Sequence, residues 1–237
     1  MGECRLKNRI FLYISPISSR HASHECLGKA VAHYIASGAY AAAEDGCEPS
    51  FPAALPSDWR LEREAHGKPH FPEAPMIHFS ISHSGGFWVC AISGQTVGVD
   101  IQERRWKGKQ SEEKGEDSGG EKKDRNGPAC CEARIAERFF HPEERQFLAR
   151  RAAKGSPDDG GGDFFDVWSA KESYVKYTGE GIGKDFRSFA VSDREGLLSY
   201  INGPEGRKIM LRHLPWDPSY SLCVCAEEIG EIRRISL

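Results

Sequence analysis

The first candidate for chemistry is an acidic side chain at the end of an apolar strand. Asp100 lies near the end of the apolar run Val97–Ile101. Gly98 lies two residues before it, and Gln102 follows the run. Because side chains alternate along a strand, Asp100 shares a face with Gly98 and Gln102. Gly98 leaves room for a ligand, and a buried carboxylate needs a cation, a hydrogen-bond donor or a metal. The simpler alternative is an aspartate that only closes a turn at the strand end.

The second candidate is a group of charged residues with helical spacing. Glu172 and Lys176 are four residues apart, so they stack on one face of a helix, whereas Lys171 projects about 100° away. One carboxylate is therefore expected between two ammonium groups. The alternative is an exposed ion pair between Glu172 and Lys176, with Trp168 as an ordinary core residue.

Two further groups have residue types that bind phosphate or move protons. Lys68 follows a glycine in a loop, and Ser82 and His83 end a predicted strand. A cation, a hydroxyl and an imidazole can bind a phosphate, although ordinary turns use the same residues. Glu144 lies in the first turn of a predicted helix that begins at Pro142, where the helix dipole is a sufficient reason for an acid.

These residues require strands and helices to position them. Three short strands separated by tight turns between residues 77 and 101 predict an antiparallel meander. Asp166 is expected to cap the helix that carries Glu172, and Gly179 to end it. Strands are expected at 7–14, 77–82, 87–93, 97–101, 189–191, 197–200, 208–213 and 221–226, and helices at 25–37, 132–140, from 142 onward and at 166–178.

Length and composition indicate a globular protein of one large or two small domains. The chain has 237 residues, with 39% hydrophobic and 28% charged residues and a net charge of −3. This balance excludes a general nucleic-acid binder, so any phosphate site must be local. No apolar run is long enough for a membrane span or a signal peptide, and we expect a cytoplasmic protein without a membrane partner.

The cysteines and two polar segments predict reduced thiols and mobile insertions. The eight cysteines show no disulfide or zinc spacing and are expected to be reduced, with Cys223 and Cys225 packing on one strand face. The mixed-charge segment 103–128 and the Gly/Asp-rich segment 154–163 are predicted to be mobile insertions. A faint similarity between Trp88–Ala91 and Leu222–Ala226 is what two similar α+β halves would produce.

In this order along the chain, the motifs GKP, SISHS, GVDIQ, FFHPEE and WSAKESYVKYTGEG resemble the 4′-phosphopantetheinyl transferase superfamily. The closest resemblance is to its long, monomeric, surfactin-synthetase-activating type, from about Gly67 to Gly183. It implies an α+β fold of two similar α/β subdomains, residues 1–97 and 98–237, related by pseudo-twofold symmetry with the active site in the cleft between them.

The resemblance also implies an activity. Such an enzyme moves the phosphopantetheine arm of coenzyme A to a serine of an acyl or peptidyl carrier protein, as holo-[acyl-carrier-protein] synthases do. It releases 3′,5′-ADP and uses Mg²⁺ bound to the pyrophosphate. Asp100 and Glu172 match the shared metal ligands, and Gln102 stands where many members have an acid. An amide has no negative charge, so we expect weaker metal binding, with Gln102 acting directly or through water.

The remaining motif residues match substrate-binding and catalytic positions. Lys171 and Lys176 match lysines near the phosphates, and Glu144 matches a proposed general base with Glu172 as the competing candidate. Lys68, Ser82 and His83 match residues that hold the phosphates of coenzyme A.

Several alternatives stay open at this point. The choice between Mg²⁺ and Mn²⁺ and the identity of the carrier are not determined. A protein of the same fold that binds coenzyme A or a carrier without turnover is the second hypothesis. Another metal-dependent phosphotransferase lacks support, because no Walker loop, HD pair or zinc signature is present.

Overall fold

The computed structural model describes residues 8–17, 22–38, 59–104, 128–153, 162–181 and 185–237. The predicted insertions 103–128 and 154–163 lie largely outside these ranges. The described elements form two four-stranded sheets, each with one or more helices packed against it, which confirms the α+β fold class. Within the described part of the chain, no helix is long and apolar enough to span a membrane.

The first sheet is covered by one helix. Its elements are β1 (Ile10–Pro16), α2 (Ala22–Ala36), β4 (His78–Ser84), β5 (Phe87–Ser93) and β10 (Ile232–Ser236), beside the small pair β2 (Glu62–Arg63) and β3 (Pro69–His70). The strand order is β10-β1-β5-β4, with β1 parallel to β10 and antiparallel to β5. Leu27, Val31 and Tyr34 form the apolar stripe of α2 and pack with Phe79 and Trp88, as their helical spacing predicts.

The second sheet carries the remaining helices. Its elements are β6 (Val97–Glu103), α3 (Pro128–Phe139), α4 (Pro142–Ala153), α5 (Gly162–Thr178), β7 (Tyr200–Asn202), β8 (Lys208–His213) and β9 (Tyr220–Ala226). The order is β6-β9-β8-β7, and all neighbours are antiparallel. Cys223 and Cys225 are free, buried thiols in the core between this sheet and α5, as predicted.

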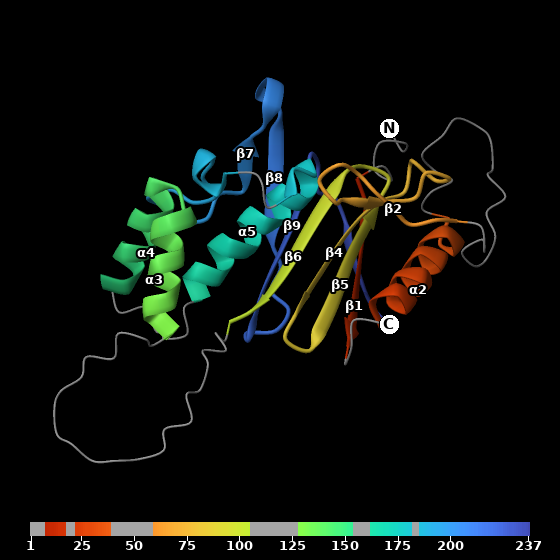
Figure 1. The fold of residues 1–237 in the computed structure, drawn as a ribbon, viewed down its shortest axis with the longest axis horizontal. Coiled ribbons are helices and arrows are strands. Elements are labelled where there is room, and N and C mark those ends of the chain that lie inside the picture. The colour runs from red at the N-terminus through yellow and green to blue at the C-terminus, as the bar shows by residue number, and fades with distance from the viewer. Residues whose placement is uncertain (1–7, 18–21, 39–58, 105–127, 154–161, 182–184) are drawn as a thin grey trace, which may run out of the picture.

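The inner faces of the two sheets share a third core. Leu12 and Val89 of the first sheet pack with Val97, Val99 and Leu222 of the second. Figure 1 shows the sheets side by side, with α2 on one outer side and α5 on the other. Because β6 lies where the sheets meet, its two faces have different neighbours, and its even-numbered residues face α5.

The predicted meander is wrong at its third strand. β6 pairs with β9 instead of continuing from β5. It still lies beside β4, but side chains replace a backbone ladder: the N–H groups of Val99 and Glu103 donate to the hydroxyls of Ser80 and Ser84, at 3.0 and 2.8 Å. Turn signals gave the bounds of β5 and the start of β6 correctly, whereas β4 and β6 each extend two residues further than predicted. These signals do not determine which strand becomes the partner.

Two other predictions around α5 need correction. The expected strand 189–191 is instead an irregular segment that follows a 3₁₀ turn at Phe186–Ser188. α5 begins at Gly162, so Asp166 lies inside the helix and is not its cap. The predicted end at Thr178 is confirmed, because Gly179 adopts φ +74° and its N–H donates to the Val175 carbonyl. The division into halves 1–97 and 98–237 stays a prediction.

Candidate active site

Asp100 is buried on the face of β6 that packs against α5. The residue is only 1% exposed. Gly98, two residues earlier on the same face, touches the helix backbone so closely that a Cβ there would collide with Ser173 and Tyr177. The glycine therefore lets α5 lie directly on the strand, and charged side chains of the helix can reach Asp100.

Both oxygens of Asp100 accept hydrogen bonds from three different directions. Oδ1 accepts from the Ser82 hydroxyl at 2.7 Å and from the Lys176 ammonium at 2.6 Å. Oδ2 accepts from the Gln102 amide nitrogen at 2.9 Å. Strand β4, helix α5 and strand β6 thus each contribute one polar group, and the structure brings together four residues that the sequence singled out.

Glu172 adds a second carboxylate to this cluster. It lies one helical turn before Lys176 and is half-buried. Among the described residues, no hydrogen bond or ion pair reaches its carboxylate. Burial and the neighbouring charge of Asp100 raise the pKa of Glu172 to about 7, against the opposing effect of Lys176. Within the described part of the chain, two carboxylates therefore share the Lys176 ammonium group, and the cluster has an excess of negative charge when Glu172 is ionised.

The donor set of this cluster fits a hard divalent cation. Mg²⁺ is usually held by one or two carboxylates, with phosphate oxygens and waters as the other ligands. In the part of the chain that the structure describes, no three His, Cys, Asp or Glu side chains gather into a metal site. Asp100 and Glu172 with the Gln102 amide therefore match a site that a phosphate substrate completes, and do not match an all-protein metal cage.

Lys171 and Glu144 form a separate, closed ion pair. Both side chains are completely buried, with 2.7 Å between Nζ and Oε1. Lys171 also donates to the Phe189 carbonyl, and Glu144 accepts from the backbone N–H groups of His141 and Val191. Burial raises the pKa of Glu144 and lowers the pKa of Lys171, while each charge opposes the shift of the other. The expectation that Lys171 flanks Glu172 is wrong.

The three predicted phosphate-binding residues lie in different environments. Ser82 is buried against Asp100. Lys68 donates to the carbonyl of Tyr177 at 2.8 Å, next to Lys176, and burial lowers its pKa. His83 is exposed and, as the residue after Ser82, points to the other face of β4. The structure thus brings Ser82 into the cluster and Lys68 to its border, but not His83.

The role of the other serines of β4 was not predicted. Ser80 and Ser84 bind the backbone of β6 on both sides of the Ser82 contact. The sequence does contain a pattern that indicates this role: a serine at every second position of the strand. Such residues share one face, and their hydroxyls can accept hydrogen bonds from the backbone of an adjacent strand. These two contacts hold β4 beside Asp100.

Comparison with known proteins places this architecture in a family. Residues 96–225, more than half of the chain, match the family model of the 4′-phosphopantetheinyl transferase superfamily. This chain belongs to the 4′-phosphopantetheinyl transferase superfamily. The matched region runs from β6 to β9 and includes Asp100, Glu172 and both lysines of α5, whereas Lys68 and Ser82 lie before it.

Several curated relatives are similar over most of this chain. A "4′-phosphopantetheinyl transferase" of Bacillus subtilis is 31% identical over 164 residues, 69% of this chain and 61% of the relative. The "4′-phosphopantetheinyl transferase Sfp" of B. subtilis strain 168 is 30% identical over 171 residues, 72% and 64% of the two chains. The matched region therefore spans less than two thirds of either relative. The protein "gsp" of Aneurinibacillus migulanus is 33% identical over 119 residues, 50% and 38% of the two chains.

Proposed function

We propose that this superfamily member is a Mg²⁺-dependent phosphopantetheinyl transferase. It moves the 4′-phosphopantetheine arm of coenzyme A to a serine of an acyl or peptidyl carrier protein and releases 3′,5′-ADP. The observation that carries this proposal is the convergence of Asp100, Glu172 and Lys176 on one point between β6 and α5, inside the family-matched region. The relatives named as 4′-phosphopantetheinyl transferases support the same activity.

The acidic cluster has the groups that a diphosphate substrate needs. Asp100 and Glu172, with the Gln102 amide, would hold the metal ion, which when bound withdraws charge from the pyrophosphate. Lys176 pairs with Asp100 at 2.6 Å and is 28% exposed, so its ammonium can also meet phosphate oxygens from solvent. Lys68, in the loop before β3, contacts the Tyr177 carbonyl near the end of α5 and supplies a further cation for the nucleotide phosphates.

Glu144 fits a positioning role better than direct proton transfer. Three donors already occupy its oxygens, and the side chain has no exposed surface for a carrier serine. With Lys171, it joins the first turn of α4 to α5 and to the segment around Val191. We therefore assign the acidic cluster on the β6 side of α5, and not the buried pair, to the contact with substrate.

Mass spectrometry of apo carrier proteins tests the proposed activity. Incubation with coenzyme A and Mg²⁺ should add one phosphopantetheine to at least one member of a panel of fatty-acid, polyketide and peptide carriers. Asp100→Asn is the matched negative control, because it keeps the side-chain shape but removes the charge. The absence of any mass gain across the panel, with binding of coenzyme A retained, would favour the second hypothesis of a binding protein without turnover.

Metal titration separates the remaining alternatives. Transfer measured against Mg²⁺ and Mn²⁺ concentration identifies the working cation, and size-exclusion chromatography tests the expected monomer. The substitution Gln102→Glu adds the missing negative charge of the cluster. A large gain in transfer rate at saturating metal would show that the natural Gln102 impairs the site, whereas a gain only at low metal shows that it weakens metal affinity alone.

A further inference from the structure

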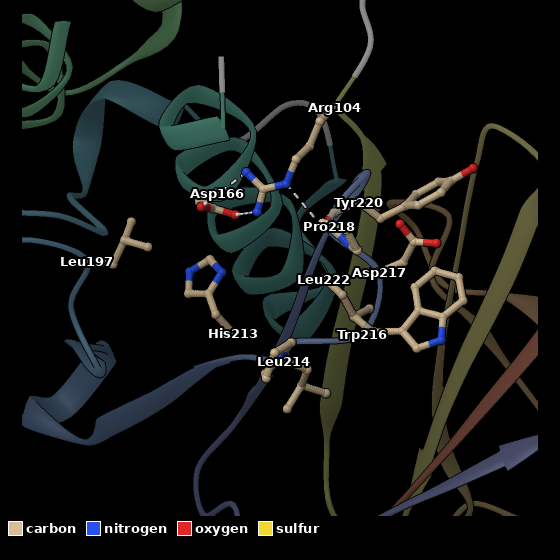
Figure 2. Close-up of a pocket in the computed structure, with 11 residues that line it drawn as sticks. Arg104, Asp166, Leu197, His213, Leu214, Trp216, Asp217, Pro218, Tyr220 and Leu222 are labelled. Carbon is tan, nitrogen blue, oxygen red and sulfur yellow. Dashed lines mark hydrogen bonds and ion pairs between the residues drawn. The ribbon is translucent and has the colours of Figure 1, made fainter. Parts of the chain in front are cut away.

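A second ion pair joins β6 to α5 beyond the acidic cluster. Arg104 directly follows β6, and its guanidinium contacts Asp166 through two nitrogens, at 2.8 and 3.4 Å (Figure 2). Its Nε donates to the Tyr220 carbonyl, and its backbone N–H donates to the Ser219 carbonyl. Arg104 therefore extends the β6–β9 pairing by one residue and fixes the end of the strand to the helix.

Asp166 is also held from the side of β9. The Ser221 hydroxyl donates to its Oδ1 at 2.5 Å, and the hydroxyls of Ser221 and Ser169 are 2.7 Å apart. Ser221 is the register partner of Gln102 in the β6–β9 ladder. The network around Asp166 thus reaches the residue that directly contacts Asp100.

The two ion pairs between β6 and α5 have opposite polarity. At one end the strand supplies the acid, Asp100, and the helix supplies the base, Lys176. At the other end the strand supplies Arg104 and the helix supplies Asp166. The four residue steps from Asp100 to Arg104 span about 13 Å along the strand, and the ten residue steps from Asp166 to Lys176 span about 15 Å along the helix. Because these lengths are similar, both ion pairs form at one position of the helix along the strand. A shift of the helix along the strand would separate both pairs at once.

The Arg104–Asp166 pair is partly exposed, with 21% of each side chain accessible to solvent. It lines a cavity of about 510 Å³ whose other walls include His213, Trp216 and Tyr220 (Figure 2). Within the described residues, neither ring nitrogen of His213 has a hydrogen-bond partner, so Asp166 is hydrogen-bonded to Arg104 and not to His213, although His213 and Asp166 lie close enough to interact electrostatically. The ion pair therefore supplies a direct contact between α5 and the end of β6 at the wall of this cavity, in addition to the close packing of α5 on Gly98.

We propose that Arg104 and Asp166 are positioning residues for the metal site. Between the two ion pairs lie Gln102 on the strand and Glu172 on the helix. The pair fixes the helix register in which Glu172 and Asp100 can reach one cation, although neither member of the pair touches that cation. This inference rests on the proposed function, because it needs a metal bound between β6 and α5.

Metal affinity measured without turnover tests the inference. In the full chain, the Mg²⁺ dependence of the melting temperature and the electron paramagnetic resonance signal of bound Mn²⁺ both report occupancy. Asp166→Asn and Arg104→Gln should each raise the half-saturating metal concentration by about 10-fold. The double variant should be no worse than either single variant, because the two residues act as a pair. Arg104→Lys keeps the charge without the two-nitrogen contact and should show a smaller rise.

A neighbouring ion pair provides the matched control. Arg151 of α4 contacts Asp163 in the first turn of α5 at 2.8 Å, away from β6. Asp163→Asn should lower the melting temperature as much as Asp166→Asn, but leave the half-saturating metal concentration unchanged. If Asp166→Asn behaves like this control, the positioning role is overturned. If the wild type itself binds neither Mg²⁺ nor Mn²⁺, the proposed function fails and this inference fails with it.

Discussion

Helix α5 carries two lysine–carboxylate pairs that differ in how completely they are closed. Lys171 and Glu144 are 2.7 Å apart and fully buried, and every oxygen of Glu144 has a donor. Lys176 and Asp100 are 2.6 Å apart, but the lysine is 28% exposed, and beside them lies the carboxylate of Glu172, to which no described residue donates a hydrogen bond. Lys171 and Lys176 are only five residues apart on α5. The first belongs to a fully buried pair with balanced charges, and the second to a partly exposed cluster with excess negative charge.

The difference shows what makes a charged cluster available for binding. A buried charge is tolerated when its partners are complete, and such a pair has nothing left to offer a ligand. The Lys171 ammonium even lies 4.2 Å from the ring centre of Phe189, inside an aromatic shell. Among the described residues, the Asp100 cluster instead has one more acid than base, and Lys176 is partly exposed, so a bound cation can offset the repulsion between the two carboxylates. The following predictions test this contrast from the largest effect to the smallest.

Removal of the lysine from the closed pair should have the largest effect on stability. Lys171→Met leaves Glu144 buried without its cation, and the free energy of unfolding should fall by about 3–5 kcal/mol. Urea denaturation measures this loss. The double variant Lys171→Met/Glu144→Leu should recover part of it, because no buried charge remains. A Lys171→Met protein of wild-type stability would show that the pair is not structural.

Loss of charge in the open cluster should affect turnover more than stability. Asp100→Asn and Glu172→Ala should each lower the transfer rate at least about 100-fold, because each removes a proposed ligand of the metal ion. Asp100→Asn should destabilise the fold far less than Lys171→Met, since Lys176 reaches solvent. Transfer assays with urea denaturation of the same samples check both expectations. If the variants lose stability to the same extent as Lys171→Met while they lose activity, the open cluster does not differ from the closed pair in its role.

Lys176→Gln should weaken transfer by about 10-fold without abolishing it, because Lys68 and the metal still face the phosphates. The rate should be measured at saturating Mg²⁺, so that a change in metal affinity does not contribute. Lys208→Gln is a suitable control, because Lys208 lies over the ring of Tyr200 on the β7–β8 hairpin. Equal losses from Asp100→Asn, Glu172→Ala and Lys176→Gln would refute the separate roles.

The smallest expected effect is a gain in stability without metal. At about pH 8 most of the Glu172 carboxyl is ionised beside Asp100, since its pKa is about 7 in the folded protein. Glu172→Gln removes both the burial of this charge and its repulsion with Asp100, and should raise the free energy of unfolding by about 1 kcal/mol in EDTA. With excess Mg²⁺ the wild type should become the more stable protein, because only its folded state gains the full binding energy. Denaturation curves under both conditions give the comparison.

Local patterns predicted the members of the open cluster but not all of its connections. Alternation placed Asp100 and Gln102 on the face of Gly98, and helical spacing placed Lys176 on the face of Glu172. The same spacing gave the direction of Lys171, but not its partner, which lies on α4 at the far side of α5. The β9 partner of β6 is about 120 residues away and leaves no signal within the strand itself.

The sequence alone determined the residue types of the site, the elements that carry them and the end of α5 at Gly179, because these depend on side-chain periodicity and backbone conformation within a few residues. Tertiary structure decided which charges meet. It paired Lys171 with Glu144, gave Glu172 no hydrogen-bond or ion-pair partner among the residues that the structure describes, and joined Arg104 to Asp166 across 62 residues. These outcomes depend on desolvation and distance in three dimensions, since the partner of a charge is the group that packing brings within a few ångströms.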